Sequence, residues 1–62
     1  MFIVKDSNGA EVKVSEILTS FRGEKFKLLD CVHPRKLYAE SIEHGYRQEF
    51  FAGVFDVTIE EV

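Results

Sequence analysis

The chain is poor in cysteine, proline and tryptophan. Its 62 residues include one cysteine, one proline and no tryptophan. A single cysteine, Cys31, cannot form an internal disulfide, so the chain is not a disulfide-stapled secreted scaffold and a reducing cytosol is the simplest location. It also lacks an apolar run of about 18 residues and a basic segment followed by an apolar one. Neither a transmembrane helix nor a signal peptide is therefore expected.

Residues that carry catalysis or metal binding are also scarce. The only nitrogen and sulfur ligands are Cys31, His33 and His44, whereas a zinc site needs at least three protein ligands at characteristic spacings. Cys31 and His33 would share one face of a strand, but a small buried core cysteine is the favoured interpretation. No serine has a glycine-elbow context, and no phosphate-binding loop or dinucleotide fingerprint occurs. The sequence predicts a non-enzymatic protein without catalytic residues, metal or cofactor.

Short apolar segments separated by tight turns are abundant. Asn8-Gly9, Arg22-Gly23-Glu24, His33-Pro34-Arg35 and His44-Gly45 interrupt runs rich in Val, Ile, Phe, Tyr and Leu. Such runs at such spacing are typical of a small all-β domain. We expect residues 1–62 to form one SH3-like barrel of five to six short antiparallel strands, with a hairpin start and a short 3-10 corner before the last strand.

The first strands can be placed by their alternation. Asn-Gly is the strongest hairpin signal, so residues 2–6 are expected to pair with residues 10–14, with Val12 and Val14 facing inward. Residues 15–21 are open to two interpretations: a helical turn capped by Ser15, or a strand beginning at Ile17. The longest strand is expected over residues 25–32, where the proline loop ends it.

The remaining strands follow from the same pattern. Leu37 and Ala39 should lie on the face opposite Tyr38, and Val57 and Ile59 should face inward. The predicted segments are strands at 36–42 and 46–51, the corner at 52–55 and a closing strand at 56–60.

The net charge of −3 is unevenly distributed. Residues 22–36 contain five cations and two carboxylates (+3), whereas residues 37–62 contain one cation and six carboxylates (−5). Arginine suits carboxylate or phosphate ligands because its planar fork donates two parallel hydrogen bonds. An ordinary solvated strand face is the alternative. The candidate binding residues are Arg22, Lys25, Arg35, Lys36, Tyr38, Tyr46 and Arg47.

Six phenylalanines are many for so small a domain. Only about four would fit inside a barrel of this size, and consecutive Phe50 and Phe51 must point to opposite faces of a strand. The surplus indicates either a protein-facing or self-associating patch, or ordinary surface exposure.

Two segments carry a resemblance to a protein group. Thr19-Ser20-Phe21-Arg22-Gly23-Glu24 and the closing residues 49–57, with a proline loop and the Tyr38 strand between them, are similar to short, mostly uncharacterised bacteriophage and prophage proteins. Their pattern is an SFRGE turn, a proline loop, a GRVYV strand and an FYPSVF-L-I ending, and the resemblance covers residues 8–59. Here Arg35-Lys36-Leu37 replaces the glycine-arginine, and Ala52-Gly53 replaces the closing proline. The group has no assigned catalytic residues to carry over.

The resemblance implies a phage-encoded protein of the host bacterial cytoplasm, which suggests host takeover or anti-defence. We expect an interaction module that binds, and inhibits, a host bacterial protein such as a defence component. One alternative is an oligomeric sponge for a small anionic molecule such as a signalling nucleotide, since one barrel this small offers no enclosed pocket. Another is a nucleic-acid-binding barrel, which the acidic last 26 residues oppose. No membrane partner is expected, and homo-oligomerisation is compatible with the marginal core.

Overall fold

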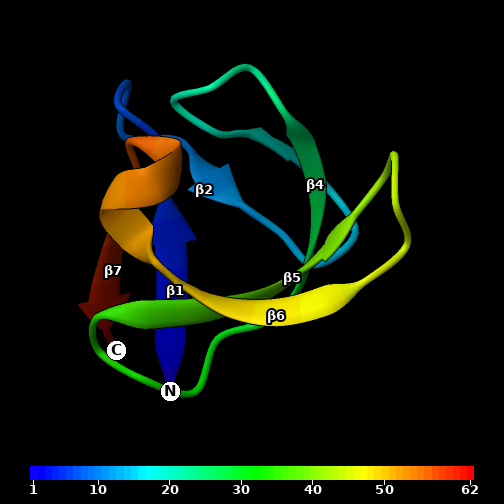
Figure 1. The fold of residues 1–62 in the computed structure, drawn as a ribbon. Helices are drawn as coiled ribbons and strands as arrows, with labels where there is room; N and C mark the ends of the chain where they lie inside the picture. The colour runs from blue at the N-terminus through cyan, green and yellow to red at the C-terminus, as the bar shows by residue number, and fades with distance from the viewer.

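Seven short antiparallel strands make up the protein (Figure 1), for which a computed structural model describes residues 1–62. The prediction of an all-β domain with a 3-10 corner before the last strand is confirmed. The elements in chain order are β1 (Phe2–Lys5), β2 (Glu11–Val12), β3 (Ile17–Thr19), β4 (Lys25–Asp30), β5 (Lys36–Ser41), β6 (Arg47–Phe51), the 3-10 helix η1 (Ala52–Phe55) and β7 (Thr58–Glu61).

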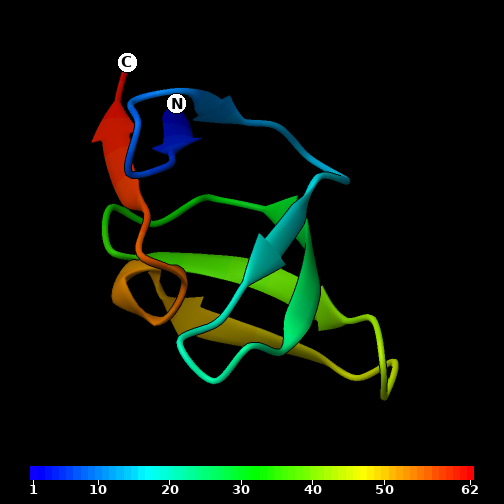
Figure 2. The ribbon, with the colours of Figure 1, turned by 90° about the horizontal axis from the view of Figure 1, so that it is seen from above.

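The strands form two sheets that lie one above the other (Figure 2), in the orders β2-β1-β7 and β3-β4-β5-β6. Hydrogen bonding does not close them into one barrel, and the expected five to six strands were too few. The additional strand is β3, which lies in the segment where the sequence allowed either a helical turn or a strand. A strand wins there because Ile17, Leu18 and Thr19 pair with Lys27, Phe26 and Lys25 of β4. No helix of the structure is long and apolar enough to cross a bilayer.

The first hairpin is present, but it is shorter than expected. The Asp6 carboxylate accepts hydrogen bonds from the main-chain N–H groups of Asn8 (2.9 Å) and Ala10 (3.0 Å), and Gly9 adopts a φ of 83°. Val4 pairs with Val12, which is buried as predicted. The prediction that Val14 faces inward was wrong, since its side chain is 61% exposed. The chain leaves the ladder after Val12 and turns at Ser15 (φ 78°), so the alternation stops there.

The core lies between the two sheets and is aromatic at one end. Phe26 packs edge-to-face against Phe50 and Phe55, with ring centroids 4.9 and 5.3 Å apart. Leu37 and Ala39 lie on the face opposite Tyr38, as predicted, and both are buried. Val57 is buried as predicted, and Ile59 packs against the core from a half-buried position. The other buried apolar side chains are Val4, Val12, Leu18 and Leu28.

The longest predicted strand ends two residues early. A bulge between Leu28 and Asp30 shifts the register of β4 against β5, and the strand stops at Asp30. The bulge leaves Leu29 as the extra residue and places Asp30 opposite Tyr38. An acidic side chain thereby joins the outward-facing row of the four-stranded sheet.

Candidate functional site

The seven side chains predicted to bind a partner lie in three places. Four point outward from the face of the β3-β4-β5-β6 sheet that faces away from the core, called here the outer face. Two line a hollow on the other side of that sheet, and one lies in the loop between β4 and β5. The outer face carries Lys25, Lys36, Tyr38 and Arg47. The hollow is lined by Arg22 and Tyr46, and the loop residue is Arg35.

The outer face carries mixed charge. Glu40 stands between Lys27 and Arg47 in one cross-strand row, with N···O distances of 3.8 and 3.9 Å. Lys25 donates from Nζ to Thr19 Oγ1 at 2.8 Å. Each of these cations already has a polar neighbour within the chain. Residues 22–36, which are basic in sequence, therefore do not form a basic surface, because acidic side chains of β5 and β6 lie beside their cations on the outer face.

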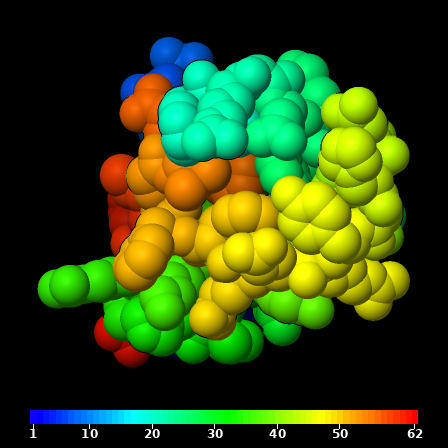
Figure 3. All heavy atoms as spheres, in the orientation of Figure 1, coloured from blue at the N-terminus to red at the C-terminus, as the bar shows by residue number.

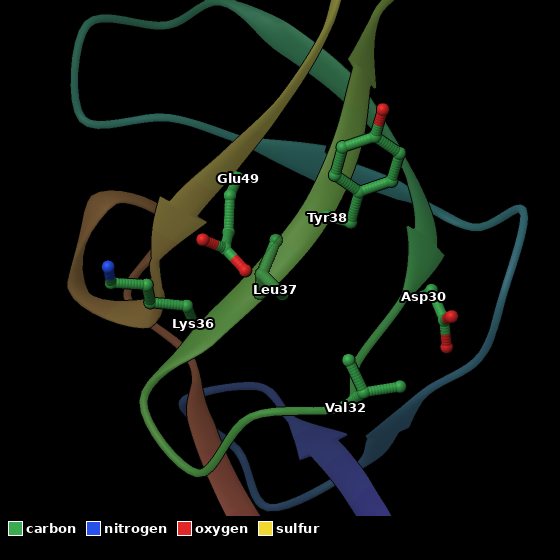
Figure 4. A pocket seen from close by; sticks show the side chains of 6 residues that line it. All are labelled: Asp30, Val32, Lys36, Leu37, Tyr38 and Glu49. Atoms are coloured by element: carbon green, nitrogen blue, oxygen red, sulfur yellow. The ribbon is translucent and has the colours of Figure 1, made fainter.

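A shallow groove of about 190 Å³ crosses this outer face (Figure 4). Tyr38 lies between its register partners Asp30 on β4 and Glu49 on β6. The Lys36 ammonium lies 4.9 Å from the centroid of the Phe51 ring. The groove therefore offers two carboxylates, one ammonium group, a phenol and apolar walls. Its lining residues are Asp30, Val32, Lys36, Leu37, Tyr38 and Glu49.

A second hollow, of about 180 Å³, lies where the β3–β4 turn approaches β6 and η1. We call it the aromatic hollow. Figure 3 shows a depression there, between the cyan turn and the yellow and orange surface of β6 and η1. Phe26 (2% exposed) and half-buried Phe50 lie on its inner side, and exposed Phe21 and Tyr46 stand at its rim. Its lining residues are Ser20, Phe21, Arg22, Glu24, Phe26, Tyr46, Phe50 and Val54.

The β3–β4 turn holds Phe21 in place through main-chain contacts. The buried Ser20 hydroxyl oxygen accepts hydrogen bonds from the N–H groups of Arg22 (3.3 Å) and Glu24 (3.2 Å). Gly23 takes a φ of 83°, which a side chain would strain. The Phe21 N–H donates to the Val54 carbonyl of η1 at 2.9 Å. The turn is thus tied to η1 although the Phe21 side chain remains 76% exposed.

Ring contacts extend the aromatic core to this surface. Tyr46 meets Phe26 edge-to-face at 6.2 Å and stacks on His44 at 6.3 Å. The Arg22 guanidinium carbon lies 5.6 Å from the Phe21 ring centroid, within the range of a cation–π contact. An apolar side chain from another molecule could enter the hollow against several rings, beside one cation and the Glu24 carboxylate.

The sequence did not single out Phe21 or Val54 as site residues. One feature of the sequence indicated such a site: the tight Ser20–Glu24 turn contains a bulky apolar residue next to an arginine. A turn residue has no sheet neighbour to cover it, so exposure of Phe21 could have been expected. The approach of Val54 could not, because it depends on how η1 packs after β6.

Cys31 does not form the Cys–His pair considered from the sequence. Its thiol donates to the main-chain carbonyls of His33 and Lys36, both at 3.6 Å, while His33 Nδ1 accepts the Arg35 N–H at 3.0 Å. Burial raises the pKa of the Cys31 thiol above its ordinary value of 9.0, and the nearby Asp30 charge adds to the effect. A main-chain hydrogen bond from His33 that favours the thiolate lowers the pKa and offsets part of this rise. The structure places no group of three or more His, Cys, Asp or Glu side chains where they could hold a metal ion.

We expect iodoacetamide to alkylate Cys31 several-fold more slowly in the folded protein than in urea at the same pH. The folded state favours the neutral thiol, so this contribution to stability is complete below the ordinary pKa of 9.0 and is lost as the pH rises through the higher folded pKa. Mass spectrometry of timed samples measures the rate, and Cys31→Ala should flatten the corresponding alkaline part of the pH–stability curve. Equal rates in folded and unfolded protein would contradict this assignment.

No protein-family model, curated protein or solved structure matches the chain. A function for it therefore rests on its own residues and on the two surfaces described above.

Proposed function

We propose that the chain is a non-enzymatic protein-binding module that receives an apolar side chain of a partner protein in the aromatic hollow. The observation that carries this proposal is Phe21, a phenylalanine that is 76% exposed although its main chain is fixed on both sides. Leaving so large an apolar side chain in water brings the isolated domain no burial energy. Covering it with a partner would gain that energy with little loss of main-chain freedom.

The composition of the aromatic hollow fits protein recognition. Aromatic and arginine side chains are enriched among the residues that dominate binding energy at protein interfaces. Arg22 and Tyr46, both candidates from the sequence, stand here beside Phe21. The Arg22 guanidinium is positioned over a ring, and its fork remains suited to a carboxylate. The best partner segment would combine a leucine, methionine or phenylalanine anchor with a neighbouring acidic residue.

Dimensions and charge argue against the two rival functions. The outer-face groove and the aromatic hollow have volumes of about 190 and 180 Å³, below the roughly 300 Å³ of typical small-molecule sites. A sponge for a signalling nucleotide would have to assemble its site from several chains. A nucleic-acid surface would need cations free of nearby carboxylates, whereas Lys27 and Arg47 both lie next to Glu40.

The bacterial context comes from the resemblance to phage proteins. This context favours a cytoplasmic host protein, for example a defence component, as the partner. It also favours inhibition of that protein as the outcome of binding. The two sheets, the 3-10 corner and the return of β7 to β1 are in keeping with an SH3-like arrangement opened between its sheets. In such small β domains, function is carried by surface residues grafted on the fold.

Capture from bacterial lysate followed by titration of the purified partner tests the proposal. We expect Phe21→Ala to weaken binding at least about tenfold, as for an interface anchor, and Arg22→Ala to weaken it less. Tyr38→Ala is the matched control, because it removes an exposed aromatic from the groove on the other side of the sheet. Binding that survives Phe21→Ala but fails with Tyr38→Ala would overturn the site. Tight binding of cyclic dinucleotides, or salt-sensitive binding of single-stranded DNA, would favour the rival functions.

A further inference from the structure

Strand β6 forms one edge of the four-stranded sheet and pairs only with β5. The Ser41 N–H donates to the Tyr46 carbonyl at 2.8 Å, and the Ala52 N–H donates to the Arg35 carbonyl at 3.1 Å. Because hydrogen-bonded positions alternate along an antiparallel ladder, residues 46, 48, 50 and 52 direct their main-chain groups toward β5. The main-chain groups of Arg47, Glu49 and Phe51 therefore point away from the sheet.

These edge groups have no partner within the chain. None of the hydrogen bonds formed outside the ladders involves the main chain of Arg47, Glu49 or Phe51, and no side chain reaches them. All three residues are exposed. An open row of donors and acceptors on an edge strand is a template for another strand.

We propose that two copies of this chain associate through their β6 edges, antiparallel and with the two-fold axis at Gln48. In this register Arg47 lies opposite the partner's Glu49, and Glu49 lies opposite the partner's Arg47. Each of these facing pairs exchanges two main-chain hydrogen bonds, so four are formed in total. The two four-stranded sheets become one continuous eight-stranded sheet.

Charge selects this register. Glu49 makes no ion pair within its own chain, while the Arg47 Nε lies 3.9 Å from Glu40 and the Arg47 side chain is 61% exposed, so a second carboxylate can reach it. Opposite charges directly across an antiparallel pair stabilise it, and like charges destabilise it. Sliding the partner by two residues would set Glu49 against the partner's Glu49. The sequence of β6 therefore complements itself in one alignment and repels itself in the next.

The other edge strands lack this property. Strand β7 at the edge of the smaller sheet contains Glu60 and Glu61 and no cation. No alignment of two β7 strands can pair opposite charges, so this edge resists a second copy. Strands β2 and β3 have only two and three residues and offer few groups to pair. The self-association site is thus assigned to β6.

Sedimentation velocity tests the inference directly. We expect the mean mass to rise from 7.2 kDa toward twice that value between about 10 µM and about 1 mM protein, as suits a small interface. Arg47→Glu and Glu49→Arg should each abolish this rise, because each places like charges across the axis. An equimolar mixture of the two variants should form a dimer, because every facing pair is again opposite in charge. The Arg47→Glu/Glu49→Arg double variant should dimerise by itself.

Hydrogen exchange provides a second measure, specific to the register. The amides of Arg47 and Glu49 should exchange quickly in dilute protein and become protected at high concentration, while those of Gln48 and Phe50 stay protected throughout. Wild-type protein that remains monomeric at about 1 mM, or a dimer that both single variants leave intact, would overturn the inference. Phe21→Ala should leave dimerisation unchanged, and Glu49→Arg should leave partner capture unchanged. Failure of this inference is therefore distinguishable from failure of the proposed function.

Discussion

Replacing Phe26 with alanine should leave much of the protein unfolded at room temperature. Phe26 is 2% exposed and contacts the rings of Phe50, Phe55 and Tyr46. Truncating a buried phenylalanine costs about 3–5 kcal/mol because it removes apolar burial and leaves a cavity. A chain of this size has a total stability of roughly 3–9 kcal/mol at typical values per residue. The loss is therefore comparable with the whole free energy of unfolding.

Urea denaturation followed by circular dichroism measures this effect. Phe21→Ala is the matched control, since it removes the same side chain from a position that is 76% exposed. It should change the free energy of unfolding by no more than about 0.5 kcal/mol, as is usual for surface positions. A Phe26→Ala protein within about 1 kcal/mol of the parent would show that these rings do not form the centre of the core.

Alanine at the neighbouring positions 37 and 38 should have opposite consequences. Leu37 is 1% exposed and faces the core, so Leu37→Ala should lower the free energy of unfolding by about 2–5 kcal/mol. Tyr38 projects from the outer face of the same strand and is 41% exposed. Its replacement should cost at most about 1 kcal/mol. Chemical denaturation of both variants under identical conditions gives the comparison.

This pair tests the facing of β5, which supplies three lining residues of the outer-face groove. A one-residue slip of that strand would exchange the two roles, so a larger loss for Tyr38→Ala than for Leu37→Ala would contradict the register. Ala39→Ser provides a further check, because a hydroxyl at this fully buried position would lack a partner. It should destabilise the protein, whereas Glu40→Gln on the outer face should not.

Local chemistry made the turns and most strands predictable. The Asn8-Gly9 turn, the alternation around Leu37 and Ala39 and the corner before β7 all depend on residues close together in sequence. The prediction for Val14 was wrong because alternation alone cannot show where a strand leaves its ladder. The early end of β4 was also unpredictable, since the bulge after Leu28 arises from pairing with β5.

The candidate site was less accessible to sequence reasoning because its residues are brought together by packing between distant segments. Arg22 and Tyr46 lie far apart in the chain, and they share a hollow because the β3–β4 turn bonds to Val54 while Tyr46 packs against Phe26. Summing charge along the chain also gave a wrong expectation of where the surface is basic. Residues 22–36 are basic in sequence, yet Glu40 and Glu49 of the next two strands lie across the sheet from Lys27 and Tyr38. Surface charge follows cross-strand neighbours and not chain segments.

The pairing of β1 with β7 affects how the protein can be synthesised. These strands are the first and the last in chain order, and the Val62 N–H donates to the Met1 carbonyl at 2.8 Å. The four-stranded sheet is built from consecutive segments, so it can form while the chain is still emerging from the ribosome. Strand β1 can pair with β2 early, but its other edge stays unpaired until β7 has emerged. Until β7 has emerged, the apolar face of the larger sheet lacks its complete cover, and we expect the nascent chain to be open to chaperones and to aggregation during that interval.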